Sequence, residues 1–235
     1  MIYHRLVGIY VFTQSRPKAG TNSNSNHGDN AMPSYKLTYF DFDGGRAEPI
    51  RIAFHAAGID FEDNRISFSE FGEMRQSTRF NSVPVLEIDG AEVTQSNALS
   101  RYVGKMAGLY PDDDLQALYC DEVLGALEDL SHYIVQTFGL QDEELKLARE
   151  KLVDGWLSVY LRGLDKLLAR GGGEYFADNE LTVADLKAFV QIRSLRSGNL
   201  DHVPKDLVQR LAPGLIKHQE RIESDPRVVA YYATR

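Results

Sequence analysis

The chain has 235 residues, 43% of them hydrophobic, and a formal net charge of −8. This length can bury one large or two modest hydrophobic cores, and no apolar run reaches the roughly 20 residues that a membrane span needs. The negative charge argues against nucleic acid as a partner, and the one cysteine, Cys120, excludes an intrachain disulfide and indicates a reducing compartment.

Residues 1–31 differ in composition from the rest of the chain. A short apolar segment, MIYHRLVGIYVF, precedes the polar run TNSNSNHGDN, which cannot bury enough surface to become ordered. A weak signal peptide is one interpretation, but the apolar core is interrupted by Gly8 and lacks a clear cleavage site. We favour a disordered extension or an upstream start, because Met32-Pro33 would make a natural beginning.

Short strands and helices are predicted to alternate through residues 32–108. Gly58 is typical of the residue after a helix end, and Asp89-Gly90 is a strong signal for a two-residue hairpin turn. The predicted order is βαβαββα, which indicates a thioredoxin-like α/β domain. The expected strands are 36–40, 61–66, 85–88 and 92–94, and the expected helices are 47–57, 70–78 and 96–106.

After a linker over residues 109–114, the pattern of residues 115–235 is helical throughout. Leucine and other apolar residues recur at spacings of three to five, and no alternating strand pattern follows residue 94. We expect an all-α domain with long helices over 115–138 and 145–170, another from 182, and a last segment over 206–232 with a break near Pro213-Gly214. Thr182 to Asp185 is interpreted as a helix capping box.

Tyr39 is the candidate that the first strand presents for chemistry. The strand is followed by the turn Asp43-Gly44-Gly45 and by a helix that opens near Arg46, so the tyrosine lies where open α/β sheets bind small ligands. Residues 41–47 hold no cysteine, which excludes dithiol–disulfide chemistry there. On position alone, the favoured interpretation of Tyr39 is a half-buried aromatic side chain, the commonest role of tyrosine in a strand.

Residues 35–52, YKLTYFDFDGGRAEPIRI, together with the two-domain organisation, resemble the sigma-class glutathione transferases. The resemblance implies a cytosolic, homodimeric enzyme of the glutathione transferase fold, with glutathione as co-substrate and no metal. Tyr39 would donate a hydrogen bond to the sulfur, with Arg46 beside it. Relatives usually have a loop one residue shorter and a second arginine, where this chain has Asp43 or Gly44, so the local field is less positive.

The magnitude of one hydrogen bond suits this chemistry. A free thiol with a pKa of about 8.5 is only a few per cent thiolate at neutral pH, and the thiolate is the nucleophile. Lowering that pKa by about 2 units requires roughly 2.7 kcal/mol of preferential stabilisation of the anion. A hydrogen bond to a charged group contributes about 1.5–3 kcal/mol. A tyrosine hydroxyl is therefore sufficient without a metal or a covalent enzyme intermediate.

The resemblance also implies the residues that bind glutathione. In the segment Asn81-Ser82-Val83-Pro84, the proline would be cis and the backbone of Val83 would pair with the cysteinyl part. Gln95 and Ser96 would hold the γ-glutamyl carboxylate at a helix N-terminus, although Ser96 is also an ordinary capping residue. Phe71 and Arg75 would lie toward the glycyl end of glutathione. Asp121 would reach across a dimer to the γ-glutamyl amine of glutathione bound by the partner subunit. Phe40 and Phe42 would face the electrophile.

The sequence therefore predicts a glutathione transferase that conjugates the glutathione thiolate to small apolar electrophiles. A glutathione-dependent prostaglandin isomerase is the nearest alternative enzyme. A non-catalytic carrier or structural protein with the same fold is the alternative from another class. Cys120, His55 and His132 have no partners at the spacing of metal ligands or a catalytic triad, and we interpret Cys120 as a small core residue.

Overall fold

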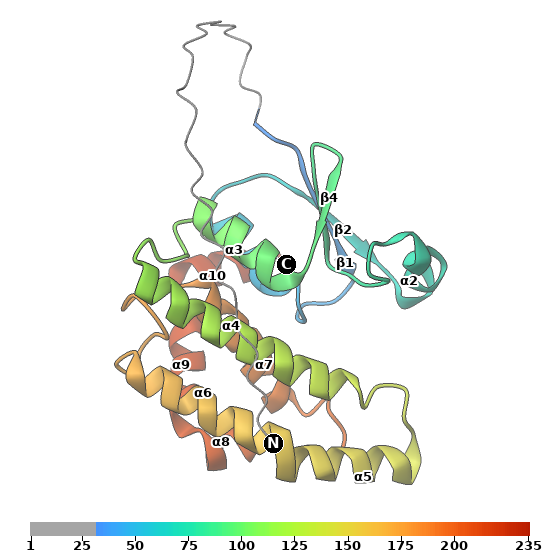
Figure 1. Cartoon of the computed structure of the whole chain (residues 1–235), viewed down its shortest axis with the longest axis vertical. Coiled ribbons are helices and arrows are strands. Elements are labelled where there is room, and N and C mark those ends of the chain that lie inside the picture. Colours follow the sequence, from blue (N-terminus) through green and yellow to red (C-terminus); the bar gives the residue numbers. More distant parts are fainter. Residues whose placement is uncertain (1–31) are drawn as a thin grey trace, which may run out of the picture. The chain divides into compact units, whose positions relative to one another are not determined.

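The computed structural model describes residues 32–235, so the expectation for residues 1–31 lies outside the described residues. The first half is built on a four-stranded mixed sheet of order β2-β1-β3-β4 (Figure 1). Strand β1 runs parallel to β2 and antiparallel to β3, and β3 and β4 form a hairpin. The strands are β1 Tyr35–Phe40, β2 Glu62–Ile66, β3 Val85–Ile88 and β4 Ala91–Thr94.

The helices of this half follow from local sequence signals. The hairpin turn has φ of 49° at Asp89 and 82° at Gly90, as a turn with two left-handed residues requires. Ser67 and Glu70 form a capping box, so the second helix begins before the predicted residue 70 and passes into a 3₁₀ turn. These elements are α1 Glu48–Ala56, α2 Phe68–Met74, the turn Arg75–Ser77 and α3 Ser96–Met106.

The second half is entirely helical, which confirms the predicted α/β domain followed by an all-α domain. The helix expected over 145–170 is interrupted by a π-helical turn, Val153–Leu157, where Gly155 leaves helical backbone angles. None of the helices within residues 32–235 has both the length and the apolar composition needed to cross a membrane. The helices are α4 Asp114–Val135, α5 Asp142–Leu152, α6 Ser158–Arg170, α7 Val183–Ser197, α8 Leu207–Leu211, α9 Pro213–Glu223 and α10 Pro226–Tyr232.

Helix α7 is the centre of the helical half and packs against α4, α9 and α1. The capping box predicted at Thr182 and Asp185 is present, and the buried Asp185 also accepts hydrogen bonds from the backbone of Phe176 and from His218. All residues from 181 to 190 are buried. Helix α7 contacts both α1 of the first half and α4 of the second half. It therefore holds these two helices in position relative to each other, and the site lies beside them.

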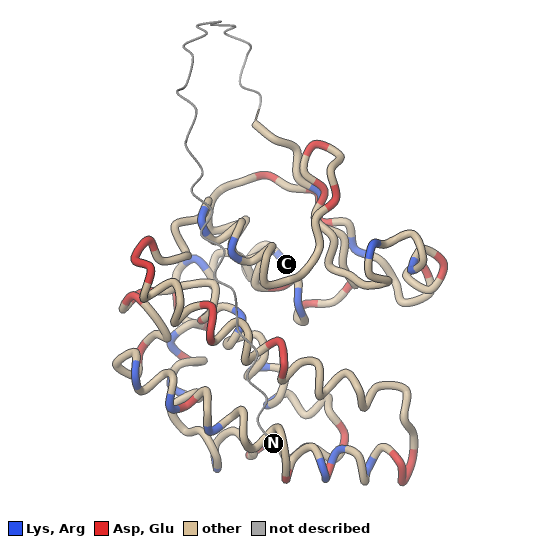
Figure 2. Tube along the Cα trace, viewed as in Figure 1, with Lys and Arg blue, Asp and Glu red and all other residues tan. Residues whose placement is uncertain are grey.

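Charged residues of both signs are scattered over the described part of the chain (Figure 2). Several are used in pairs that tie one element to another, such as Arg170 with Glu122 and Arg221 with Glu174. These pairs are largely exposed and each contributes little to stability. A second group of charged residues, in part buried, lies beside the end of β1 and includes Arg46, Glu128 and Lys187.

Candidate active site

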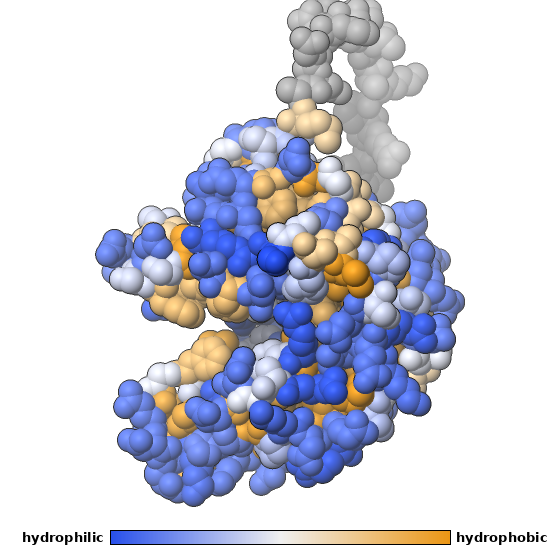
Figure 3. All heavy atoms as spheres, turned by 180° about the vertical axis from the view of Figure 1, so that it is seen from behind, coloured by the Kyte–Doolittle hydropathy of each residue, from blue (hydrophilic) through white to orange (hydrophobic). Residues whose placement is uncertain are grey.

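Two adjoining cavities open beside the carboxyl end of β1, and their volumes are about 470 and 210 Å³. The surface is hollowed into a cleft there, with hydrophobic residues on its lower lip (Figure 3). Both cavities are lined by Arg46, Ser82 and Val83. The larger lies between aromatic residues of the first half and helices α4 and α7. The smaller lies at the N-terminus of α3.

Tyr39 lies at the wall of the larger cavity and is held by its neighbours in the turn. Its side chain is only 4% exposed, and its hydroxyl oxygen accepts the backbone N–H of Arg46 at 3.1 Å. Burial raises the pKa of Tyr39, although the Arg46 amide and nearby arginines oppose that effect. The hydroxyl therefore keeps its proton at neutral pH and can donate it to a bound ligand.

Gly45 keeps the space beside this hydroxyl open. A Cβ atom added at Gly45 would come within 2.6 Å of the Tyr39 oxygen, and the backbone φ there is +65°, which side-chain-bearing residues rarely adopt. The additional loop residue that the sequence shows before Arg46 is thus accommodated by a glycine. The turn still delivers the Arg46 amide to Tyr39.

Arg46 belongs to a charged cluster that joins the two halves of the protein. Its Nε donates to Glu128 of α4 at 2.6 Å, and the other carboxylate oxygen of Glu128 accepts from Lys187 Nζ at 2.7 Å and Ser96 Oγ at 2.9 Å. Burial opposes ionisation of Glu128, but Lys187 and Arg46 together lower its pKa to about 2. The cluster of Arg46, Lys187 and Glu128 therefore carries one net positive charge beside the cavities.

Glu128 and Lys187 were not predicted from the sequence. They come from helices far along the chain, and neither belongs to a local motif. Lys187 is 6% exposed, and burial lowers its pKa while Glu128 opposes that shift. The one available signal was a lysine within an otherwise apolar run, since buried lysines usually have a charged partner or a function.

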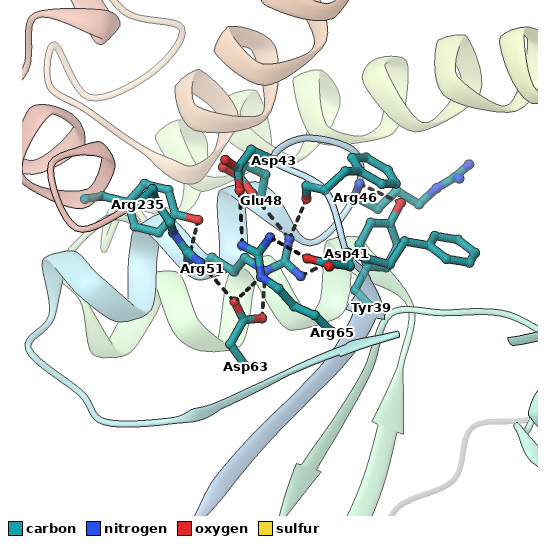
Figure 4. Close-up of polar contacts among 12 residues, drawn as sticks. Tyr39, Asp41, Asp43, Arg46, Glu48, Arg51, Asp63, Arg65 and Arg235 are labelled. Atoms are coloured by element: carbon teal, nitrogen blue, oxygen red, sulfur yellow. Dashed lines mark hydrogen bonds and ion pairs between the residues drawn. The ribbon is translucent and has the colours of Figure 1, made fainter. Parts of the chain in front are cut away.

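The loop that carries Arg46 is fastened from behind by two arginines of the first half (Figure 4). Arg51 is completely buried and donates to the carbonyls of Phe40 at 3.3 Å and Phe42 at 3.1 Å, as well as to Asp63 at 2.8 Å. Arg65 pairs with the loop residues Asp41 and Asp43 and with Asp63. Both acidic residues of the loop are therefore paired with Arg65, whose single positive charge they share with Asp63.

The smaller cavity collects the residues expected to bind the γ-glutamyl and cysteinyl parts of glutathione. It is lined by Val83, Pro84, Gln95 and Ser96, and the Val83–Pro84 peptide bond is cis, as expected. Gln95 has a φ of 75°, a strained conformation for a residue other than glycine, which directs the chain into α3. Strain of this kind is common at ligand sites.

The remaining predicted residues line the larger cavity, with the exception of Asp121. Tyr39, Phe40, Phe71, Arg75, Asn81 and Ser82 line the larger cavity. Arg75 Nε donates to the carbonyl of Asn81 at 3.2 Å. Asp121 lines neither cavity: its carboxylate accepts from Arg101 at 2.6 Å and from Tyr110 at 3.0 Å.

This fold agrees with the comparisons with known proteins. The family model of the glutathione S-transferase N-terminal domain matches residues 35–105, and that of the C-terminal domain matches residues 128–235. The chain therefore belongs to the glutathione S-transferase family.

The similar proteins include some named glutathione S-transferase and others named prostaglandin D synthase. Glutathione S-transferase 3 of Caenorhabditis elegans is 32% identical, and hematopoietic prostaglandin D synthase of Gallus gallus is 30% identical; each match covers 87% of this chain and 98% of the relative. A solved structure of prostaglandin synthase D of Nilaparvata lugens has a TM-score of 0.76 and 29% identity, covering 86% of this chain and 98% of the other.

Proposed function

We propose that this protein is a glutathione transferase in which Tyr39 stabilises the thiolate of bound glutathione for attack on a small apolar electrophile. The observation that carries the proposal is the buried Tyr39 hydroxyl, which accepts the Arg46 amide and faces a cavity of about 470 Å³. The oxygen accepts the amide and no residue from 32 to 235 accepts the hydroxyl proton, which can therefore be donated to sulfur. The net positive charge of the Arg46 cluster favours the anion further.

Within this proposal, domain 32–108 binds glutathione and domain 115–235, after the linker 109–114, supplies the wall that faces the electrophile. Gln95 and Ser96 bind the γ-glutamyl carboxylate at the N-terminus of α3, and the backbone of Val83 binds the cysteinyl part. Arg75 binds the glycyl carboxylate beside Phe71. The peptide from Asn81 to Pro84 forms the rim between the two cavities, and Phe40 contacts the electrophile.

The decisive experiment is an ultraviolet difference spectrum of the glutathione complex, followed by conjugation assays. We expect a thiolate band at neutral pH and turnover of aryl halides, enones or isothiocyanates, because the thiolate is the reactive form. Binding of glutathione without this band, and without turnover of any electrophile, would identify a carrier or structural protein instead.

A glutathione-dependent prostaglandin isomerase is a second candidate for the same site. It is favoured by the relatives named prostaglandin D synthase, among them the Gallus gallus protein. The same thiolate would serve both reactions, so including prostaglandin H in the assays separates the two functions by their products.

We also propose a homodimer, in which Asp121 binds the γ-glutamyl amine of glutathione held by the partner subunit. Asp121 is about one-third exposed and lies outside the cavities of its own chain, which suits a contact of this kind. Sedimentation should give a dimer, and Asp121→Asn should raise KM for glutathione more than it lowers kcat. A monomer in sedimentation would refute the shared site.

The proposed location is the cytoplasm, where reduced glutathione and a buried free thiol such as Cys120 persist.

A further inference from the structure

Helix α7 presents a polar stripe to the larger cavity, although the rest of that helix packs in the core. Lys187, Gln191 and Ser194 all line the cavity, and their spacings of four and three residues place them on one face of the helix. The stripe runs from the buried Lys187 to the exposed Ser194. The facing wall, from the first half of the protein, is aromatic and is formed by Phe40, Phe42, Phe68 and Phe71.

Lys187 is the charged end of this stripe, and one N–H donor of its ammonium group has no hydrogen-bond acceptor within residues 32–235. Two of its three N–H donors go to Glu128 and Asn97. The third has no acceptor among residues 32–235, and the side chain lines the cavity. Lys187 is therefore a cationic residue of the cavity lining with one N–H donor that the residues from 32 to 235 leave unused.

This cation is held in place by the cluster that also holds Arg46. Glu128 binds Arg46 through one carboxylate oxygen and Lys187 through the other. Arg46 in turn donates its backbone N–H to Tyr39. The buried ammonium is thus connected through Glu128 and Arg46 to the hydroxyl proposed to bind sulfur. Hydrogen bonds from a charged donor are stronger than those between neutral groups.

We propose that Lys187 is a specificity-determining residue that donates a hydrogen bond to a carbonyl oxygen of the electrophile, so that the enzyme prefers α,β-unsaturated ketones and aldehydes. The inference rests on the proposed glutathione transferase function and names its substrate class. An aromatic wall on one side and a cationic donor on the other suit an apolar molecule with one oxygen conjugated to the carbon under attack.

The reaction balances without an added oxidant or reductant. The thiol proton of glutathione passes to solvent on binding, and the thiolate sulfur forms a bond to the β-carbon of the enone. The π pair of the C=C bond moves toward the carbonyl oxygen, which becomes an enolate and accepts the third N–H of Lys187. Water then protonates the α-carbon, so that the net change is addition of S–H across the double bond. Stabilising charge as it develops on oxygen is the step that Lys187 would accelerate.

A matched pair of electrophiles tests this role. Both 4-phenyl-3-buten-2-one and benzyl chloride carry a phenyl group, but only the first develops charge on a carbonyl oxygen. We expect Lys187→Met to lower the ratio of kcat/KM for the enone to that for benzyl chloride about 10- to 100-fold, as loss of one charged hydrogen bond in the transition state predicts. The control Lys217→Met removes an exposed lysine of α9 and should leave the ratio unchanged.

An equal loss with both electrophiles would show that Lys187 supports only the thiolate or the packing of the site, and would overturn the inference. No change in the ratio would do the same. If Lys187→Met does not fold, the wild-type protein still provides a test. The ketone 4-phenylbutan-2-one should then inhibit more strongly than butylbenzene despite being less hydrophobic, and the reverse order would refute the inference. Failure of the wild type to conjugate these two or any other electrophile, with no thiolate band, would instead refute the proposed function.

Discussion

Replacing Tyr39 by phenylalanine is expected to lower kcat/KM about 10- to 100-fold at neutral pH while the protein stays folded. The change removes one hydroxyl that would donate to an anionic sulfur, an interaction of about 1.5–3 kcal/mol. The ring that packs against Phe40 and Phe42 is retained. The variant loses two interactions: the hydrogen bond that the Tyr39 hydroxyl would donate to sulfur, and the one that its oxygen accepts from the Arg46 amide.

The measurement that checks this is the pH dependence of the thiolate band of bound glutathione. In the wild type the band should appear well below the pKa of a free thiol, about 8.5. In Tyr39→Phe it should move upward toward that value, because the anionic form has lost its donor. Rates measured at high pH, where the thiol ionises unaided, should then approach those of the wild type.

Tyr35→Phe is the matched control, since it removes a hydroxyl from the same strand. The Tyr35 hydroxyl contacts Tyr102 and Met106 and lies outside both cavities. This variant should keep the wild-type band and rate. Were Tyr39→Phe to retain both as well, the thiolate would have another stabilising group, and Arg46 would be the first residue to test.

The fold could be predicted from the sequence where signals are local. The hairpin at Asp89-Gly90, the capping box at Thr182 and the order of strands and helices in the first half are all confirmed. The π-helical turn at Gly155 was missed, because a single glycine inside a helical pattern is usually tolerated. The second break in the last helical segment, before Pro226, was also missed, although Asp225 caps the new helix.

The residues of the candidate site could likewise be predicted only where they lie in local motifs. Tyr39, Arg46, Val83 and Ser96 lie in short motifs beside the sheet, and the structure brings all four to the cavity walls. The cluster that links them depends on residues brought together by packing of α4 and α7, for which the chain has no contiguous motif. The less positive field expected because of Asp43 stays a prediction, and the structure adds that this residue pairs with Arg65.

Replacing Arg51 by methionine is expected to lower the free energy of unfolding by about 3–5 kcal/mol, the range found when one partner of a buried ion pair is removed. Glu48, which is as fully buried as Arg51, would lose its arginine, whereas the partly buried Asp63 would keep Arg65 and Arg235. For a protein of this size the loss corresponds to a fall in melting temperature on the order of 10 °C. Thermal and urea unfolding measure it directly.

Function should fall together with stability in this variant, because Arg51 also binds the carbonyls on either side of the loop after β1. The exposed pair of Arg210 with Asp206 provides the control: Arg210→Met should cost only about 0.5 kcal/mol. Adding Glu48→Gln to Arg51→Met should recover part of the lost stability, since it removes an unpaired buried charge. If Arg51→Met is no more destabilising than Arg210→Met, the buried ion pairs do not hold this loop, and the position of Tyr39 must depend on β1 and the Arg46 amide alone.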